Sequence, residues 1–315
     1  MSGTSATTAS TTVAPAHGPR ATDYALLLLL GLVFGSTYLF VSVALQTIPP
    51  ITLAALRAVV GFLALAALTL AFGHEVPRDR RSWRAFFLLG FFGGGLPFIL
   101  MSLGQQHIDS SLASILITSM PLFTLALAHL FTDDRASPRK LVGVLIGFAG
   151  ILLLLGPAAL KGQGSSLLGQ LLYIGVALSY AVMGVLIRRL GAGSGTALSR
   201  TACSNGVATL MLIPLAFLLE RPLAVSPSTH SILAVLALGL ISSTVGQFLV
   251  FRLNATAGPN FTSANNYIGP PVGIMWGVLL LGEEITWLRI AAMLVIFAGI
   301  AFATTRTGVV RQESR

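Results

Sequence analysis

The sequence predicts an all-α integral membrane protein with ten transmembrane helices, arranged as two inverted five-helix repeats with both termini in the cytoplasm. Three observations lead to this prediction: an apolar composition, an uneven placement of Lys and Arg between the apolar segments, and an internal repeat. The first indicates the membrane, the second gives the orientation, and the third divides the chain into halves.

The composition is too apolar for a soluble protein. Of the 315 residues, 55% are hydrophobic and only 9% are charged, with a mean hydropathy of +0.86. Soluble domains carry about 25% charged residues. The apolar residues also come in runs of about 20, the length with which an α-helix crosses the hydrocarbon core of a bilayer.

The apolar runs predict ten helices, with short connections rich in Gly and Pro between them. They are placed at about residues 23–44, 51–72, 84–105, 110–131, 139–156, 167–188, 196–219, 230–252, 260–281 and 286–305. No loop is long enough to hold a soluble domain. The lone Cys203 has no partner in the chain for a disulfide.

Lys and Arg are concentrated in the segments that a cytoplasmic N-terminus places inside. Fourteen of the 19 basic residues fall there, three (Lys161, Arg221 and Arg289) fall outside, and the other two, Arg57 and Arg200, lie within predicted spans. Short cytoplasmic loops carry the excess of Lys and Arg in membrane proteins, so we expect a multi-pass protein of the inner membrane. A nucleic-acid partner is not expected, because the basic residues form no face interleaved with aromatic side chains.

The second half of the chain repeats features of the first. The Phe-Ala-Gly-Ile run at residues 148–151 recurs at 297–300, an offset of 149 positions that also relates Pro121 to Pro270. Five spans per half is an odd number, so the second half enters the membrane in the opposite sense. Inverted repeats of this kind suit a carrier with a solute site between the halves.

The repeat gives the expected organisation. It comprises a disordered cytoplasmic tail over residues 1–22, a first repeat over 23–156, a second repeat over 166–305 and a cytoplasmic tail over 306–315. The tail over residues 1–22 lacks the basic and apolar regions of a signal peptide. We expect the protein to work as a monomer in the lipid bilayer on a small-molecule substrate.

Several short motifs lie in the first, second, fourth and ninth predicted helices. They are the Phe-Gly-Ser-Thr-Tyr run at residues 34–38, Pro50 followed by Arg57, Pro121, and the Leu-Gly-Glu-Glu run at residues 281–284. With them, the chain resembles the drug/metabolite transporter superfamily, EamA type, over about residues 23–305. Within it, the chain is similar to bacterial exporters of the YddG kind, a resemblance that implies export of aromatic amino acids.

Polar and aromatic side chains inside the spans are the candidates for lining a solute cavity, since polar groups in a membrane usually face a cavity or another helix. These candidates are Ser36, Tyr38, Phe98, Met101, Ser119, Tyr180, Gln247, Asn265, Asn266, Tyr267 and Trp276. Pro121, Pro270 and Pro271 are candidate hinges, because proline interrupts the helical hydrogen-bond ladder. The alternatives are hydrogen bonds between packed helices for the hydroxyls and core filling for the aromatic rings.

Charged residues near the helix ends are candidates for gates. We predict ion pairs between Arg57 and Glu283 or Glu284 on the outer side. On the inner side, Arg200 would pair with Asp133 or Asp134. The alternative is that the arginines extend to the lipid headgroups. No carboxylate lies deep in a span, so we expect no proton coupling, and no motif suggests a metal or cofactor.

The candidate set offers amides, hydroxyls and aromatic faces but no deep charge, which favours a solute that is neutral overall and partly apolar. We therefore expect a secondary transporter that exports small amphipathic metabolites, aromatic amino acids first, by alternating access. The alternatives are a broad-specificity drug or metabolite exporter and a channel. An enzyme is not expected, because the chain lacks the H-E-x-x-H and G-x-S-x-G motifs of hydrolases.

Overall fold

The computed structural model describes residues 19–131, 137–190 and 193–304, and all regular structure in these residues is helical. The first half contains α1 (Ala21–Ala44), α2 (Pro50–Ala71), α3 (Arg80–Gly90), η1 (Phe91–Gly95), α4 (Leu96–Gly104), α5 (Ser110–Leu116), η2 (Ile117–Ser119), α6 (Met120–Phe131) and α7 (Pro138–Leu160). The second half contains α8 (Gly164–Leu190), α9 (Ala197–Leu219), η3 (Pro222–Ala224), α10 (Thr229–Leu236), η4 (Ala237–Val245), α11 (Gly246–Thr256), α12 (Pro259–Thr262), α13 (Asn265–Leu281) and α14 (Trp287–Thr304).

Nine stretches of the described chain are long and apolar enough to cross a membrane. Three of them are composite, because α3–η1–α4, α5–η2–α6 and α10–η4–α11 each run on as one span. The helix expected at 260–281 consists of the short α12 and of α13, which has 17 residues with Pro270 and Pro271 inside it. The helix bounds agree with those expected to within a few residues, and α1 begins at Ala21, inside the expected tail.

Polar residues in the connections start many of these helices. The side chains of Asp79, Asp109, Ser137, Thr196 and Ser228 each accept a hydrogen bond from a backbone N–H in the first turn that follows. Such N-caps satisfy donors that have no partner within the helix. The short connections therefore fix where the helices begin.

The two halves pack their helices in corresponding ways. Pairs formed by equivalent helices are in contact, namely α2 with α9, α5 with α13, and α7 with α14. The contact of α1 with α13 matches that of α8 with α6, and the contact of α8 with α4 matches that of α1 with α10 and α11. A π-helical turn also interrupts both corresponding spans, as η1 in one and η4 in the other.

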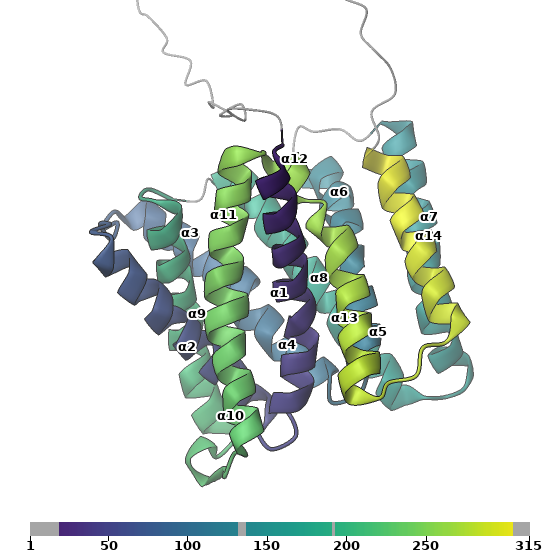
Figure 1. Ribbon diagram of the computed structural model, residues 1–315, viewed down its shortest axis with the longest axis horizontal. Helices are drawn as coiled ribbons and strands as arrows, with labels where there is room; N and C mark the ends of the chain where they lie inside the picture. The colour runs from purple at the N-terminus through teal and green to yellow at the C-terminus, as the bar shows by residue number, and fades with distance from the viewer. Residues whose placement is uncertain (1–18, 132–136, 191–192, 305–315) are drawn as a thin grey trace, which may run out of the picture.

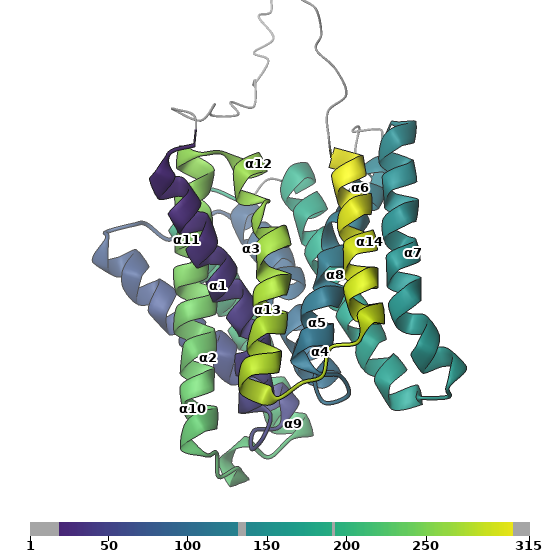
Figure 2. The same cartoon turned by 45° about the vertical axis from the view of Figure 1, so that its right-hand side comes forward.

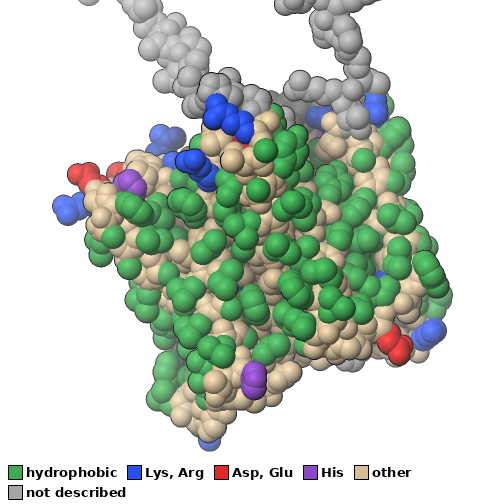
Figure 3. Space-filling view, viewed as in Figure 1, with side chains coloured by type: hydrophobic (Ala, Val, Ile, Leu, Met, Phe, Trp, Pro, Cys, Tyr) green, Lys and Arg blue, Asp and Glu red, His purple; other side chains and the backbone are tan. Residues whose placement is uncertain are grey.

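The helices run between two ends of the molecule, which we call the upper and lower sides after the orientation of Figure 1. On the upper side α1 begins and α14 ends; on the lower side α2 and α5 begin, and α9 and α13 end. Between these ends the molecular surface is largely apolar (Figure 3), and large side chains such as Leu70, Leu145 and Leu210 are exposed. In that view most Lys and Arg side chains lie toward the upper edge, and only isolated ones lie near the lower edge.

Glycines allow α7 and α14 to touch backbone to backbone. A Cβ atom at Gly299 of α14 would lie 2.5 Å from the backbone nitrogen of Gly147 and 2.6 Å from the carbonyl oxygen of Gly143, both on α7. Small residues at helix interfaces permit such an approach in membranes, where van der Waals packing drives association. The pair α7–α14 stands beside the remaining helices in Figures 1 and 2.

Candidate solute-binding centre

Arg57 is buried in the interior, on the lower half of α2. It lies about 10 Å along the helix from Pro50, and its side chain is only 7% exposed. Its guanidinium carbon lies 4.1 Å from the centroid of the Phe98 ring, and its Nη1 lies 3.9 Å from the sulfur of Met101. Its Nε has no hydrogen-bond partner. The expectation that no charge lies deep in the protein is therefore wrong.

Three tyrosines from α1 and α8 lie near this arginine. Tyr38, Tyr173 and Tyr180 are all close enough to Arg57 to interact with it electrostatically, and the rings of Tyr38 and Tyr173 are 6.4 Å apart. Gln105, which ends α4, connects them. Its amide nitrogen donates to the Tyr38 carbonyl and the Ser42 hydroxyl at 2.8 Å each, and its amide oxygen accepts from the Tyr173 hydroxyl at 2.6 Å.

These side chains come from four helices and from both halves of the chain. We call the set the Arg57 centre: Tyr38, Arg57, Phe98, Met101, Gln105, Tyr173 and Tyr180. It joins α1, α2 and α4 of the first half to α8 of the second. It brings together four of the side chains that the sequence nominated for a cavity, namely Tyr38, Phe98, Met101 and Tyr180.

The remaining candidates lie elsewhere. The hydroxyls of Ser36 and Ser119 donate to carbonyls of their own helices, at 2.6 Å in both cases. Tyr267 packs edge-on against Phe297, with ring centroids 5.2 Å apart. No described contact places Gln247 or Asn266 in the Arg57 centre.

Two of the candidates on α13 have buried polar atoms without partners. The amide oxygen of Asn265 and the indole nitrogen of Trp276 make no hydrogen bond within the described residues. The amide oxygen of Asn265 lies toward α1, 3.7 Å from where a Cβ atom of Gly31 would be. Among the candidate hinges, Pro121 follows the 3₁₀ turn η2, and the Pro270 carbonyl accepts a 3.3 Å hydrogen bond from the Ser114 hydroxyl of α5.

Glu283 binds the start of α5 rather than an arginine. Its carboxylate accepts hydrogen bonds from the backbone N–H groups of Ser110 and Ser111 at 2.8 Å, and from both of their hydroxyls. Arg57 instead faces Phe98, and Glu284 is exposed. The predicted pairing of Arg57 with Glu283 or Glu284 is therefore absent from this structure, because the four donors at the start of α5 take up the Glu283 carboxylate.

A second carboxylate on the lower side accepts hydrogen bonds from the start of α2. Glu220, which follows α9, accepts hydrogen bonds from the backbone N–H of Ile51 at 3.0 Å and from the backbone N–H and hydroxyl of Thr52 at 2.7 Å each. We call Glu220 and Glu283, with the helix starts they bind, the lower seal. Beside it, Arg289 pairs with Asp109 at 2.8 Å. The seal ties α9 to α2 and α13 to α5.

On the upper side, Arg200 lies in the first turn of α9, where its Nη1 donates to the carbonyl of Gly193 at 3.4 Å. Its predicted partners Asp133 and Asp134 lie outside the described residues. Asp79 connects the start of α3 to the chain before α9, because it accepts hydrogen bonds from the Ser194 hydroxyl at 2.6 Å and the Ser82 backbone at 2.8 Å.

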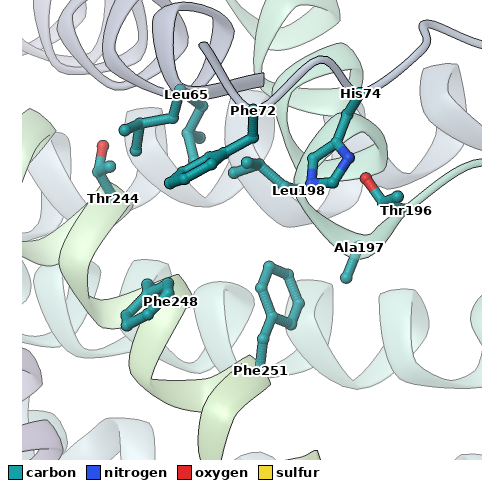
Figure 4. Close-up of a pocket in the computed structure, with 10 residues that line it drawn as sticks. Leu65, Phe72, His74, Thr196, Ala197, Leu198, Thr244, Phe248 and Phe251 are labelled. Atoms are coloured by element: carbon teal, nitrogen blue, oxygen red, sulfur yellow. The ribbon is translucent and has the colours of Figure 1, made fainter. Parts of the chain in front are cut away.

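A cavity of about 370 Å³ opens on the upper side, between the end of α2, the start of α9 and the spanning segment η4–α11. Its walls are mostly apolar: Leu65, Leu68, Phe72, His74, Thr196, Ala197, Leu198, Thr244, Phe248 and Phe251. Figure 4 shows Phe72 at the end of α2 facing Phe248 and Phe251 of α11. We call this space the upper cavity.

Sequence reasoning missed Gln105, Tyr173 and Glu220. A signal for Tyr173 was present, because Tyr173 and Tyr180 are separated by two helical turns and therefore share one face of α8. Gln105 gave no such signal, since it lies at a predicted helix end, where polar residues are expected in any case. Glu220 finds its partners on a helix start more than 160 positions away.

Replacing Gln105 with Leu is expected to destabilise the protein by about 1–3 kcal/mol, because the buried hydroxyl of Tyr173 and the carbonyl of Tyr38 both lose a partner. The adjacent Gln106 is exposed, so Gln106→Leu is the matched control. Thermal unfolding in detergent measures the difference. Equal unfolding temperatures for the two variants would show that the Gln105 hydrogen bonds do not stabilise the centre.

The chain has recognisable relatives along almost its whole length. The model of the EamA-like transporter family matches it twice, over residues 22–156 and 167–305. It is 27% identical over 280 residues to YedA, an uncharacterized inner membrane transporter of Escherichia coli K12, covering 87% of this chain and 88% of YedA. It is 25% identical over 293 residues to a probable amino-acid metabolite efflux pump of Salmonella typhimurium, covering 88% and 93% of the two chains.

A solved crystal structure shares the fold with a TM-score of 0.61 at 21% identity, covering 91% of this chain and 98% of the other. The apolar spans of the described chain fit a multi-pass membrane protein. The chain thus belongs to the EamA-like transporter family of the drug/metabolite transporter superfamily, and it is an inner membrane transporter rather than an enzyme.

Proposed function

We propose that the protein is a secondary transporter that exports small amphipathic metabolites, foremost aromatic amino acids, by alternating access between two inverted repeats. One observation carries this proposal: the junction of α2 with α9 is held closed by Glu220 on the lower side, whereas its equivalent on the upper side borders the upper cavity. A carrier needs both arrangements, one at a time, around a central site. A single conformation of such a carrier is therefore sealed on one side and open on the other.

The asymmetry involves helices that correspond in the two halves. On the lower side Glu220 binds the start of α2, and α2 packs against α4. The equivalent junction on the upper side lies between the end of α2 and the start of α9, where the upper cavity also separates α9 from α11. In the alternate state we expect the upper junction to close and the lower seal to release.

The orientation follows from the charge distribution. We propose that the upper side faces the cytoplasm, because most Lys and Arg residues fall on that side of the predicted spans. The structure then corresponds to an inward-open state, and α12 with α13 is the ninth of the ten spans. Pro121 follows the 3₁₀ turn η2, and Pro270 and Pro271 lie inside α13 of the equivalent helix, where proline removes backbone hydrogen bonds; we propose that these three residues act as hinges.

Aromatic solutes suit the Arg57 centre because it combines four aromatic rings with polar groups. Stacking of aromatic pairs contributes about 0.5–1.5 kcal/mol beyond burial of area. We propose that Asn265 and Trp276, with their unpartnered polar atoms, and the other nominated side chains of α13 contact the solute in a different state of the cycle. The relative from Salmonella typhimurium whose name refers to amino-acid metabolite efflux supports this substrate class.

A broad-specificity exporter of hydrophobic compounds is the second candidate, and the upper cavity favours it. Its walls are apolar, and Phe72 and Phe248 on its rim are exposed. The two functions are distinguished by competition for phenylalanine transport. An excess of apolar cations or neutral drugs should block this transport in a broad-specificity exporter. The same excess should leave it unaffected in an amino-acid exporter.

The function is tested with the full chain in proteoliposomes. Vesicles preloaded with unlabelled phenylalanine should show transient accumulation of labelled phenylalanine, because counterflow requires a site that alternates between the two sides. A channel would show no counterflow and no saturation. Absence of counterflow with every amino acid and every apolar metabolite of a screening panel would refute the proposed function.

Transport is expected to be insensitive to pH in the neutral range. Burial alone would raise the pKa of Glu283, but hydrogen bonds from Ser111 and Ser110 outweigh it and hold the pKa below its ordinary value of 4.5. Hydrogen bonds from Ser194 and Ser82 lower the pKa of Asp79 to about 2. The stabilisation by both carboxylates is complete above their ordinary pKa values and is lost only as pH falls through the lowered ones.

Counterflow measured at equal pH on both sides should therefore change by less than about twofold between pH 5.5 and 8. An imposed pH gradient should not drive accumulation of phenylalanine above its equilibrium level, since we propose a facilitator without proton coupling. Uphill uptake driven by the pH gradient would contradict the absence of coupling.

A further inference from the structure

We propose that Arg57 binds a carboxylate group of the solute, so that the protein prefers monocarboxylates with an aromatic or apolar body. The proposal rests on the proposed transport function, since it names the chemistry recognised in the same centre. It adds a requirement that the sequence did not suggest, because the predicted cavity was neutral. The observation behind it is a buried guanidinium that pairs with no acidic side chain among the described residues.

A buried charge within a membrane span is costly and is normally paired. Arg57 is 7% exposed, yet no acidic side chain of the described chain pairs with it, and its Nε lacks any hydrogen-bond partner. Its two close neighbours are the Phe98 ring and the Met101 sulfur, a cation–π contact and a weak acceptor. Neither neutralises the charge or satisfies the five N–H donors of a guanidinium.

The other polar groups nearby do not provide an anion for Arg57. Both N–H donors of the Gln105 amide are used, by the Tyr38 carbonyl and the Ser42 hydroxyl, and its neutral oxygen accepts from the Tyr173 hydroxyl. Glu283, the acidic residue expected as the partner of Arg57, is held by Ser110 and Ser111. The protein therefore provides a cation and leaves the matching anion to be supplied from outside.

The phenol groups fit an anionic ligand as well. Tyr38 and Tyr180 both lie near Arg57, and a phenol hydroxyl can donate a hydrogen bond. A guanidinium with adjacent O–H donors matches the oxygens of a carboxylate, which Arg can bind through two parallel hydrogen bonds. The rings of Phe98, Tyr38 and Tyr180 provide apolar surface for the remainder of such a solute.

Binding to the full-length protein in detergent separates the charge from the rest of the solute. The probes are two pairs, phenylpropionate with phenylpropionamide and L-phenylalanine with L-phenylalaninamide, and the readout is the ligand-induced shift in thermal unfolding. We expect each carboxylate to bind at least about tenfold more tightly than its amide, as a charge-assisted hydrogen bond predicts. Similar affinities for the two members of both pairs would overturn the proposal.

Variants assign the preference to one residue. Arg57→Gln should lose the preference for carboxylates, while Arg57→Lys should retain part of it, because the charge remains but the bidentate geometry is lost. Arg200→Gln, which removes an arginine in the first turn of α9, should bind like wild type. Carboxylate binding by Arg57→Gln equal to wild type would overturn the proposal.

The outcomes distinguish this proposal from the proposed function. Counterflow of aromatic metabolites without a preference for carboxylates refutes the role of Arg57 and leaves the transport function intact. Carboxylate binding that depends on Arg57, without counterflow, supports the role of Arg57 and refutes the transport function. If Arg57→Gln does not fold, the pairs measured on wild type and on Arg57→Lys decide, since a wild type without the preference overturns the proposal.

Discussion

Replacing Glu283 with Ala is expected to open the lower seal. The carboxylate accepts four hydrogen bonds, from the backbone N–H groups and hydroxyls of Ser110 and Ser111, and these are the contacts that tie the end of α13 to the start of α5. Charge-assisted hydrogen bonds and helix caps contribute about 2 kcal/mol. Their loss should shift the balance between sealed and open states about thirtyfold toward the open one.

The shift is measured by the rate at which a maleimide labels a cysteine placed at Ser114, in a chain that also carries Cys203→Ser. Ser114 is fully buried one turn inside α5, so labelling reports opening. The neighbouring Glu284 is exposed and makes no side-chain hydrogen bond in the described chain, so Glu284→Ala is the control and should label at the parent rate. Equal rates in both variants would contradict the seal.

Replacing Gly299 with Ala should severely destabilise the protein. The added Cβ would meet the backbone of Gly147 and Gly143 at 2.5 and 2.6 Å, and backbone atoms cannot move aside as a flexible side chain can. We expect α7 and α14 to separate, with a cost of about 3 kcal/mol or more, at the upper end for overpacking. Thermal unfolding and gel filtration in detergent measure the loss.

Gly184 on α8 provides the matched control, since a Cβ atom there meets nothing within 4 Å. Gly184→Ala should be neutral or stabilising by up to about 1 kcal/mol, because Ala has the higher helix propensity. If Gly299→Ala unfolded at the same temperature as Gly184→Ala, the close contact of α7 with α14 would not stabilise the protein.

Hydropathy and proline patterns predicted most helix bounds, because the residues within an apolar run are enough to indicate where that helix begins and ends. The same local reasoning did not predict the break between α12 and α13 at residues 263–264, which leaves α13 with 17 residues. The offset between residues 148 and 297 indicated two similar halves, and the matched packing of α2 with α9 and of α7 with α14 supports that division.

The candidate site was harder to predict, because it depends on contacts distant in the sequence. Arg57 and Glu283 are both charged and near the same side, so sequence reasoning paired them. The structure instead gives Glu283 four donors on α5 and leaves Arg57 against Phe98. Single side chains on α8, such as Tyr180, could be nominated by type, whereas Gln105 could be recognised only once α1, α4 and α8 were placed together.

The central claim is that the two sides open alternately, and distances between spin labels test it most directly. One pair, at Val76 and Asn254, spans the upper cavity; the other, at Gln46 and Gln106, spans the lower side, and all four positions are exposed. Pulsed electron–electron double resonance in nanodiscs should show that Glu283→Ala lengthens the lower distance and shortens the upper one. Lengthening of the lower distance with an unchanged upper distance would indicate two sides open together, as in a channel, and would contradict alternating access.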